Sequence, residues 1–250
     1  MMTQRTIVIT GASSGIGAAL ARQVAGPGTC LMLHARKSRS ALEDVKKEAE
    51  AKGAKAEIVL GDLAEPDVSE RVISECVGAF GGLDVLVANA GFPLLKSFSD
   101  GDAADIEYAF RGNLFSFFAL ARAARSHIRK STNGRIVAVG SFTAHVFRTD
   151  MPQFPMSAAS KGALETAVRS LALEFGADDV TVNCVVPGYI EKDKGTGDGL
   201  APEKLAELRA LIPMKRIGRP DDVASMIRFL VSAEASYVTG QSLHVNGGLV

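Results

Sequence analysis

The chain has 250 residues, a length typical of one large α/β domain, and its 47% hydrophobic content is enough for a core on both faces of a sheet. Lys plus Arg and Asp plus Glu are equal at 28 each, so the composition provides no basic field for nucleic acid or an acidic membrane. The three cysteines, Cys30, Cys76 and Cys184, have neither the even number of a disulfide framework nor the spacing of a metal site. With no signal-like or membrane-spanning apolar run, we expect a cytoplasmic protein.

Short apolar runs rich in β-branched residues alternate with longer, helix-like stretches along the chain. The runs are continuous rather than alternating, which predicts strands covered on both faces, at 6–10, 29–33, 56–60, 85–88, 135–139, 180–186 and 242–245. Helices are predicted between them, at 16–25, 40–52, 68–80, 105–130, 156–176 and 221–232. This order predicts an α/β fold in one domain over 1–250: a doubly wound sheet of about seven parallel strands with helices on both faces.

The least regular part of the chain is 191–200, which contains three glycines and several charges. It follows a strand that ends at Pro187 and Gly188, and ligands bind outside the carboxyl ends of strands in such sheets. We therefore expect 191–212, with a short helix at 202–211, to form a substrate lid. An ordinary surface loop is the alternative.

A glycine-rich turn, Thr-Gly-Ala-Ser-Ser-Gly-Ile-Gly at 10–17, joins the first strand to the first helix. Gly11 permits a tight turn, and Gly15 and Gly17 let the backbone approach a pyrophosphate and let the helix pack close to the sheet. The helix N-terminus adds free N–H groups and partial positive charge. The turn predicts a Rossmann-type dinucleotide site with contacts from Gly11, Ser13, Ser14, Gly15, Ile16 and Gly17.

The spacing Gly-x-x-x-Gly-x-Gly resembles the signature of the short-chain dehydrogenase/reductase family, and the resemblance covers nearly the whole chain. The segments 219–224, 239–241 and 245–248 resemble the family's 3-oxoacyl-[acyl-carrier-protein] reductase-like branch. The resemblance implies hydride transfer between a nicotinamide and a carbonyl carbon, with Asn113, Ser141 and Lys161 in catalytic positions. It also implies further cofactor contacts from Asp62, Leu63, Asn89, Ala90, Gly91, Lys161, Pro187, Gly188 and Ile190.

The end of the second predicted strand bears on which nicotinamide cofactor is bound. A free ribose 2′-hydroxyl is usually held by an acidic residue there, but this chain has Ala35 followed by Arg36 and Lys37. Two cations beside a small residue suit a 2′-phosphate. We therefore expect NADP, with NAD as the alternative.

The proton donor is the clear departure from the family pattern. A tyrosine four residues before the lysine normally protonates the carbonyl oxygen, but Ser157 occupies that position here. A serine hydroxyl is a far weaker acid and is shorter by a ring. A second departure is Lys192 in place of a threonine, and a third is the longer segment 141–157, which contains His145, Arg148 and Asp150.

Three explanations for the missing tyrosine stay open. The protein reduces a carbonyl with another donor, either His145, whose imidazole titrates near neutrality, or a water linked to Lys161 and Asn113. Alternatively, its substrate carries its own acid or needs little help from one. As a third explanation, it binds NADP without catalysis, as a redox sensor or an inert partner subunit.

Partners and substrate are less defined by the sequence. The helices at 105–130 and 156–176 are rich in apolar residues, including Phe110, Phe115, Phe117 and Phe118, and the resemblance implies a homodimer or homotetramer. A small-molecule carbonyl or alcohol substrate is expected, and neither nucleic acid nor membrane. The residues Phe92, Leu94, Phe142, Phe147 and Met156 predict an apolar pocket wall without identifying the substrate.

Overall fold

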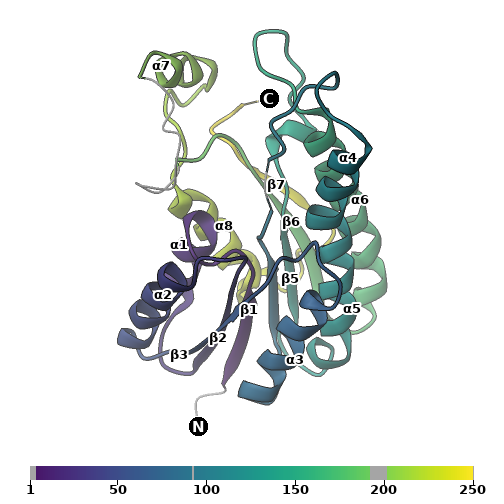
Figure 1. The fold of residues 1–250 in the computed structure, drawn as a ribbon. Helices are drawn as coiled ribbons and strands as arrows, with labels where there is room; N and C mark the ends of the chain where they lie inside the picture. Colours follow the sequence, from purple (N-terminus) through teal and green to yellow (C-terminus); the bar gives the residue numbers. More distant parts are fainter. Residues whose placement is uncertain (1–3, 92, 192–201, 250) are drawn as a thin grey trace.

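The computed structural model describes residues 4–91, 93–191 and 202–249. Within them, seven strands form one parallel sheet in the order β3-β2-β1-β4-β5-β6-β7 (Figure 1). Their bounds are β1 Arg5–Ile9, β2 Thr29–Ala35, β3 Lys55–Leu60, β4 Val85–Ala88, β5 Arg135–Val139, β6 Thr181–Pro187 and β7 Ser242–Val245. The predicted doubly wound parallel sheet is confirmed, and the order reverses between β1 and β4, where such sheets bind ligands.

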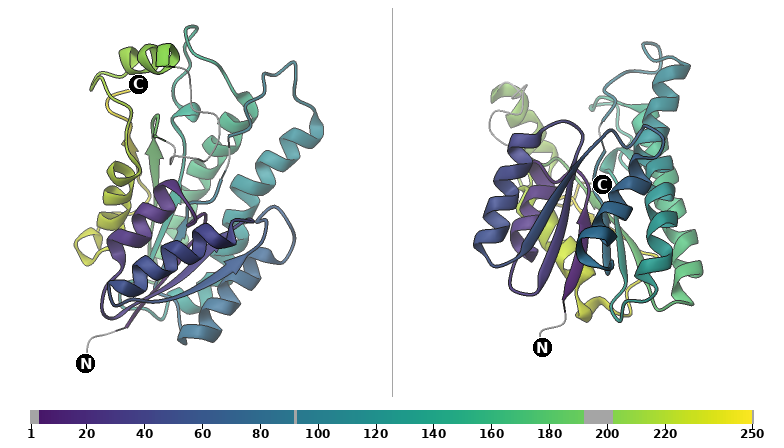
Figure 2. Two further views of the ribbon diagram at one scale, coloured as in Figure 1. Left: turned by 60° about the vertical axis from the view of Figure 1, so that its left-hand side comes forward. Right: turned by 60° about the horizontal axis from the view of Figure 1, so that its bottom comes forward.

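Helices cover both faces of the sheet (Figures 1 and 2). One layer contains α1 Gly15–Val24, α2 Arg39–Ala51 and α8 Pro220–Val231. The opposite layer contains α3 Val68–Phe80, α4 Ala103–Phe110, α5 Ser116–Ile128 and α6 Pro155–Gly176. The short helix α7 Pro202–Leu211 lies beyond the end of the sheet at which the strands finish. Among the described residues, no helix is long and apolar enough to cross a membrane.

The core lies in two layers because the strands present alternate side chains to opposite faces. Val8 and Leu86 pack toward α3, α5 and α6, whereas Ile7 and Val85 pack toward α1, α2 and α8. This burial on both faces explains why the strands have continuous apolar sequences. All three cysteines are buried and unpaired, so they serve as small hydrophobic residues of this core.

The helix predicted over 105–130 is interrupted. The chain forms α4, then a π-helical segment at Arg111–Phe115, and then α5. Helix α4 begins earlier than predicted because Asp102 and Asp105 form a capping box at its N-terminus. The π-helical segment contains Asn113, and such segments are frequent at functional sites because they redirect side chains.

Candidate functional site

The glycine-rich turn has the backbone that a dinucleotide site requires. Gly11 and Gly15 have φ angles of +66° and +55°, a region that side-chain-bearing residues rarely adopt. A Cβ at Gly17 would lie 2.8 Å from the Asn89 side-chain nitrogen and closer still to the Gly11 carbonyl oxygen. A Cβ at Gly15 would meet no atom within 4 Å, so the backbone there faces open space. The turn therefore forms a cradle of the shape that a pyrophosphate needs.

Asn89 and Thr10 hold this turn in place. Asn89 Nδ2 donates to the carbonyl oxygens of Thr10 at 2.9 Å and Gly11 at 3.1 Å. Thr10 Oγ1 in turn accepts from the backbone N–H groups of Asn89 at 3.0 Å and Ala90 at 2.9 Å. The segment after β4 is thereby fixed against the phosphate turn. Thr10 belongs to the predicted turn, but its part in holding Asn89 and Ala90 was not predicted.

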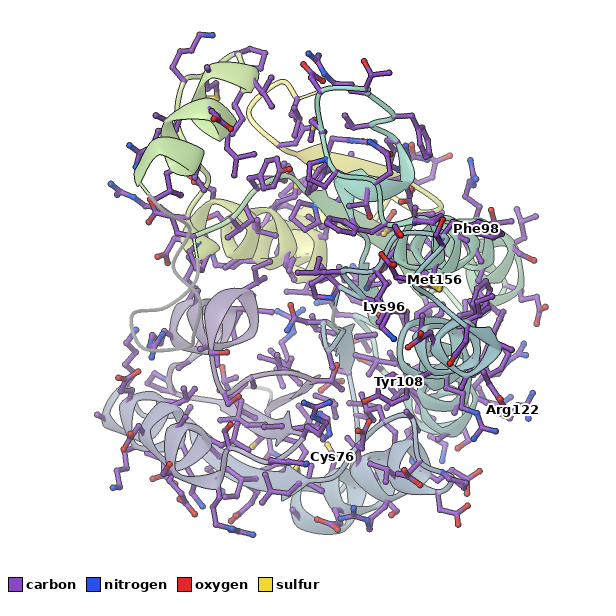
Figure 3. All side chains as sticks on the ribbon, turned by 45° about the horizontal axis from the view of Figure 1, so that its top comes forward. Cys76, Lys96, Phe98, Tyr108, Arg122 and Met156 are labelled. Carbon is purple, nitrogen blue, oxygen red and sulfur yellow. The ribbon has the colours of Figure 1, made fainter. Side chains whose placement is uncertain are left out.

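At the ends of β2 and β3, a polar cluster forms that the sequence did not predict. Arg36 Nη1 donates to the Tyr108 hydroxyl at 3.1 Å, and that hydroxyl lies 3.3 Å from Asp62 Oδ2 and donates to it. Arg36 and Asp62 are 3.8 Å apart. Figure 3 shows Tyr108 on the inner side of its helix, toward the sheet. Lys37 is exposed and Leu63 is buried beside Asp62, so the four cofactor contacts predicted here lie together at the carboxyl ends of β2 and β3.

Lys161 and Asn113 converge beside Gly91. A Cβ at Gly91 would lie 2.9 Å from both Lys161 Nζ and Asn113 Oδ1, so the absence of a side chain there leaves these two polar groups room to meet a ligand. Asn113 Nδ2 donates to Ser160 Oγ at 3.0 Å, whereas Asn113 Oδ1 is buried with no hydrogen-bond partner among the described residues. A buried, unpaired amide oxygen is costly and marks a place for a donor from a ligand or water.

Lys161 is buried on α6, and its Nζ donates to the Val139 carbonyl oxygen at 2.7 Å. Burial lowers the pKa of Lys161 to about 8, and nearby Cys184 and Glu165 oppose this shift without cancelling it. A group with a pKa near neutrality can exchange protons at the pH of the cell. The lowered pKa of Lys161 therefore suits proton transfer.

Ser157, four residues before Lys161, is bonded to backbone groups. Its side chain is 3% exposed, and its Oγ accepts from the Leu94 N–H at 2.6 Å and donates to the Leu94 carbonyl oxygen at 3.3 Å. Both hydrogen bonds tie the segment after β4 to the first turn of α6. The hydroxyl is thus engaged by backbone rather than directed at a substrate.

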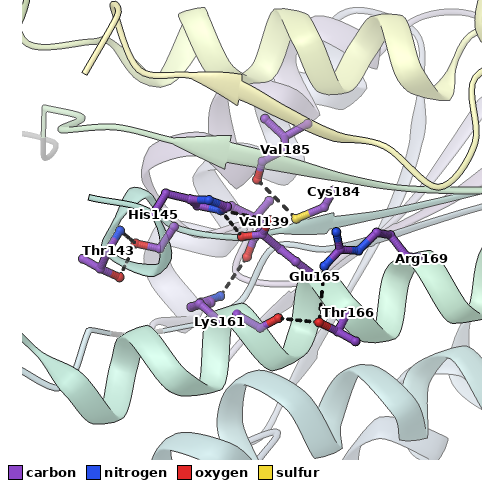
Figure 4. A network of polar contacts seen from close by, with 11 residues as sticks. Val139, Thr143, His145, Lys161, Glu165, Thr166, Arg169, Cys184 and Val185 are labelled. Carbon is purple, nitrogen blue, oxygen red and sulfur yellow. Dashed lines mark hydrogen bonds and ion pairs between the residues drawn. The ribbon is translucent and has the colours of Figure 1, made fainter. Parts of the chain in front are cut away.

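Ser141 and His145 follow β5 but have different surroundings. Ser141 Oγ accepts from the Thr143 N–H at 3.3 Å and from the Thr143 hydroxyl at 2.9 Å. His145 Nε2 lies 2.8 Å and 3.0 Å from the two carboxylate oxygens of Glu165 (Figure 4). The His145 ring also meets the His244 ring edge-on, with centroids 4.5 Å apart. Glu165 and His244 were not singled out from the sequence, because only the folded chain brings them to His145.

The end of β6 and the segment after it contain the remaining predicted cofactor contacts, Pro187, Gly188 and Ile190. A Cβ at Gly188 would lie 2.8 Å from Asn246, so Pro187 and Gly188 pass close to the C-terminal segment. Ile190 pairs with Gly218 in an isolated parallel bridge. The predicted lid helix is present as α7, but residues 192–201, including Lys192, lie outside the described residues. The lid and its role stay predictions.

The predicted apolar wall is only partly assembled. Met156 is buried, Leu94 and Phe142 are half-buried, and Phe142 packs against Tyr189 with ring centroids 4.6 Å apart. Figure 3 places Met156 near Phe98 and Lys96, where the segment after β4 meets α6. Phe147 is 70% exposed and does not contribute to a packed wall, and Phe92 is outside the described residues.

In the long segment before α6, Arg148 and Asp150 pair with each other. Their closest charged atoms are 2.7 Å apart, and both side chains are exposed. This ion pair holds the pKa of the Asp150 carboxyl below its ordinary value, chiefly through the hydrogen bond from Arg148. The pair is consistent with a solvated loop.

Comparisons with known proteins agree with this geometry. The family model described as enoyl-(acyl carrier protein) reductase matches residues 11–250. Versicolorin reductase 1 from Aspergillus parasiticus is 34% identical over 254 residues, which cover 98% of this chain and 95% of the relative. The 3-oxoacyl-[acyl-carrier-protein] reductase FabG of Staphylococcus aureus is 32% identical over 252 residues, covering 100% of this chain and 99% of the relative.

Solved structures give the same result. A short chain dehydrogenase from Burkholderia cenocepacia in complex with NADP superposes with a TM-score of 0.90 at 32% identity, covering 99% of this chain and 98% of the other. A blue fluorescent protein from a metagenomic library in complex with NADPH has a TM-score of 0.90 at 32% identity, covering 100% and 99%. Because these matches extend over almost the entire sequence, the predicted membership is confirmed, and the chain belongs to the short-chain dehydrogenase/reductase family.

Proposed function

We propose that the protein is an NADP(H)-dependent oxidoreductase that reduces a carbonyl group, or oxidises the corresponding secondary alcohol, of a small or acyl-type substrate. The observation that carries this proposal is the convergence of Lys161 Nζ and Asn113 Oδ1 beside Gly91. A buried lysine next to an unpaired, buried amide oxygen suits proton transfer as well as cofactor binding.

The site residues fit a nicotinamide dinucleotide. The positive φ angles and the open space at Gly15 suit a pyrophosphate, and the absence of an acidic residue at the end of β2 suits a 2′-phosphate. Arg36 and Lys37 supply the charge that would hold this phosphate. Two of the similar solved structures contain NADP or NADPH, which supports the same choice. When bound, the cofactor supplies or accepts the hydride.

The chain's own residues must supply the proton. Ser157 is engaged by Leu94, so the donor in this proposal is the Lys161 ammonium, acting directly or through a water held by Asn113 Oδ1. In reduction, the proton leaves Nζ for the oxygen of the former carbonyl, and the resulting amine regains a proton from solvent. His145 is the other candidate, although its Nε2 is committed to Glu165.

The test combines NADPH and NADH fluorescence titrations with an NADPH-oxidation assay on a panel of carbonyl compounds that includes β-keto acyl thioesters. The wild-type protein is expected to bind NADPH more tightly than NADH and to turn over at least one panel member. Lys161→Ala is expected to lose turnover by a factor of about 10² or more. The matched control is Lys47→Ala, because Lys47 is an exposed lysine on α2.

A second function, NADP binding without catalysis, is favoured by the engagement of Ser157 in place of a tyrosine. It predicts tight NADPH binding with no turnover of any panel member. It also predicts that Ser157→Tyr gains activity, because the rest of the site is in place. Turnover by the wild type that Ser157→Tyr does not increase would contradict this second function.

A further inference from the structure

Glu165 places a buried carboxylate next to the candidate catalytic lysine. It lies one helical turn after Lys161 on α6, and this i,i+4 spacing puts both side chains on the same face. The residue is 3% exposed, and its Oε1 lies 3.2 Å from the position of a Cβ at Gly140, directly after β5. The carboxylate is therefore packed between α6 and the end of β5, close to the candidate site.

Titratable groups face this carboxylate from every element around it. His145, from the segment after β5, bonds to both carboxylate oxygens (Figure 4). Cys184 on β6 and His244 on β7 lie close by, and His244 contacts the His145 ring. On α6 itself, Lys161 precedes Glu165, whereas Arg169 is exposed and bonds to Thr166.

A buried carboxylate is stable only where positive charge or hydrogen-bond donors compensate it. His145 supplies the direct hydrogen bond, and Lys161 supplies the buried positive charge on the same face of α6. Burial lowers the pKa of Lys161, and Glu165, together with Cys184, acts in the opposite direction and raises it. Without this carboxylate, the ammonium form of Lys161 would be harder to maintain at neutral pH.

We propose that Glu165 is a positioning residue of the reaction, whose buried carboxylate keeps Lys161 in its ammonium form, and that His145 acts by orienting Glu165 rather than by donating the proton. The inference rests on the proposed function, because it assigns a task within the same site. It accounts for the commitment of His145 Nε2 to a carboxylate that the family pattern does not explain.

The consequence for pH dependence has a definite sign. Reduction needs the ammonium form of Lys161, so turnover is full below the pKa of Lys161 and is lost as the pH rises through it, near about 8 in the wild type. Glu165→Gln removes the negative charge while keeping the size of the side chain, which lowers the pKa of Lys161 further. The basic limb of the kcat profile then moves to lower pH.

The experiment measures kcat against pH for wild type, Glu165→Gln and Glu165→Asp, together with an NMR titration of ¹³C-labelled lysine Cε in each protein. Glu165→Gln is expected to lower kcat at pH 8 by a factor of about 10, with a smaller loss at pH 6. The Lys161 resonance, assigned by its absence in Lys161→Met, is expected to titrate at lower pH. Glu165→Asp keeps the charge and is expected to restore both readouts toward wild type.

His145→Asn separates the two roles of the histidine. Asparagine retains an N–H donor for Glu165 but cannot serve as an acid, so kcat is expected to fall by less than about tenfold. A loss of 10² or more with an unchanged Lys161 titration would make His145 the donor and overturn the inference. An unchanged Lys161 titration in an active Glu165→Gln variant would overturn the inference alone, whereas a wild type without turnover on the whole panel would overturn the proposed function with it.

Discussion

At the scale of single residues, the surroundings of Ser157 and Lys161 bear most on what the site can do. Ser157, which the resemblance aligns with the family tyrosine, uses its hydroxyl to bind the backbone of Leu94. The proposed function therefore assigns the acid role to Lys161, which is buried and has a pKa of about 8. The sequence predicted a serine in place of the tyrosine but not its hydrogen bonds to Leu94, because these depend on a contact between residues 63 positions apart.

Replacement of Ser157 by alanine tests this structural role. Ser157→Ala removes both hydrogen bonds to Leu94 and leaves buried backbone groups unpaired, so the free energy of unfolding is expected to fall by about 1–3 kcal/mol. Urea unfolding measures this change, and kcat on a responsive carbonyl substrate is expected to fall by less than tenfold. A loss of kcat by 10² or more in a normally stable variant would instead identify the Ser157 hydroxyl as the donor.

Burial of the Lys161 side chain is also expected to lower the free energy of unfolding. Its pKa is about 8 in the folded chain and 10.5 as the ordinary value, so at pH 7 the folded state carries the full cost of the buried charge. Lys161→Met is expected to raise the free energy of unfolding at pH 7 by about 1–3 kcal/mol.

The wild-type penalty should also shrink as the pH rises from 8 toward 10.5, because the unfolded state then binds more protons than the folded state. Urea unfolding at both ends of this range checks the sign. Lys47→Met serves as the exposed control, with an expected change within about 0.5 kcal/mol. If Lys161→Met is destabilised at pH 7, the lysine is not under a desolvation penalty.

At the scale of elements, the strands and most helices follow from apolar periodicity, and the predicted bounds of β4, β5 and β7 match the structure. The break between α4 and α5 could not be predicted from this periodicity, because a π-helical segment widens the helical turn without disturbing the apolar pattern. The glycine-rich turn was predictable because its residues are consecutive. The sequence could not predict the contacts of Glu165, Tyr108 and His244, since their partners come from distant segments.

The strand-to-helix turn makes a prediction with an internal control. Gly17→Ala forces a Cβ against the Gly11 carbonyl oxygen and the Asn89 side chain, so NADPH affinity is expected to fall at least tenfold, with a loss of stability. Gly78→Ala, within α3, adds a Cβ that meets no atom within 4 Å and should stabilise the protein by about 0.5–1 kcal/mol. Fluorescence titration and urea unfolding read both effects. Equal NADPH affinity in Gly17→Ala and wild type would refute the assignment of the cradle.

At the scale of the whole molecule, the expected homodimer or homotetramer stays a prediction, and apolar side chains on one helical layer support it. Phe115, at the end of the π-helical segment, is 54% exposed, Phe118 on α5 is 40% exposed, and Leu173 on α6 is 83% exposed. Phe118→Arg is expected to shift the protein toward the monomer in sedimentation velocity, because a charge would be buried in the interface. The exposed Phe229 lies on α8, in the opposite layer, and Phe229→Arg is the control for this face. Sedimentation of the wild-type protein as a monomer would contradict the predicted homodimer or homotetramer.

The account as a whole depends on catalysis without the family tyrosine. The most direct measurement is NADPH oxidation by wild-type protein on the carbonyl panel, repeated with Lys161→Ala under identical conditions. We predict measurable turnover by the wild type and a loss of about 10² or more in Lys161→Ala, with NADPH binding still detectable. Tight NADPH binding by a wild type that oxidises NADPH with no panel member, or equal turnover by Lys161→Ala, would contradict the account.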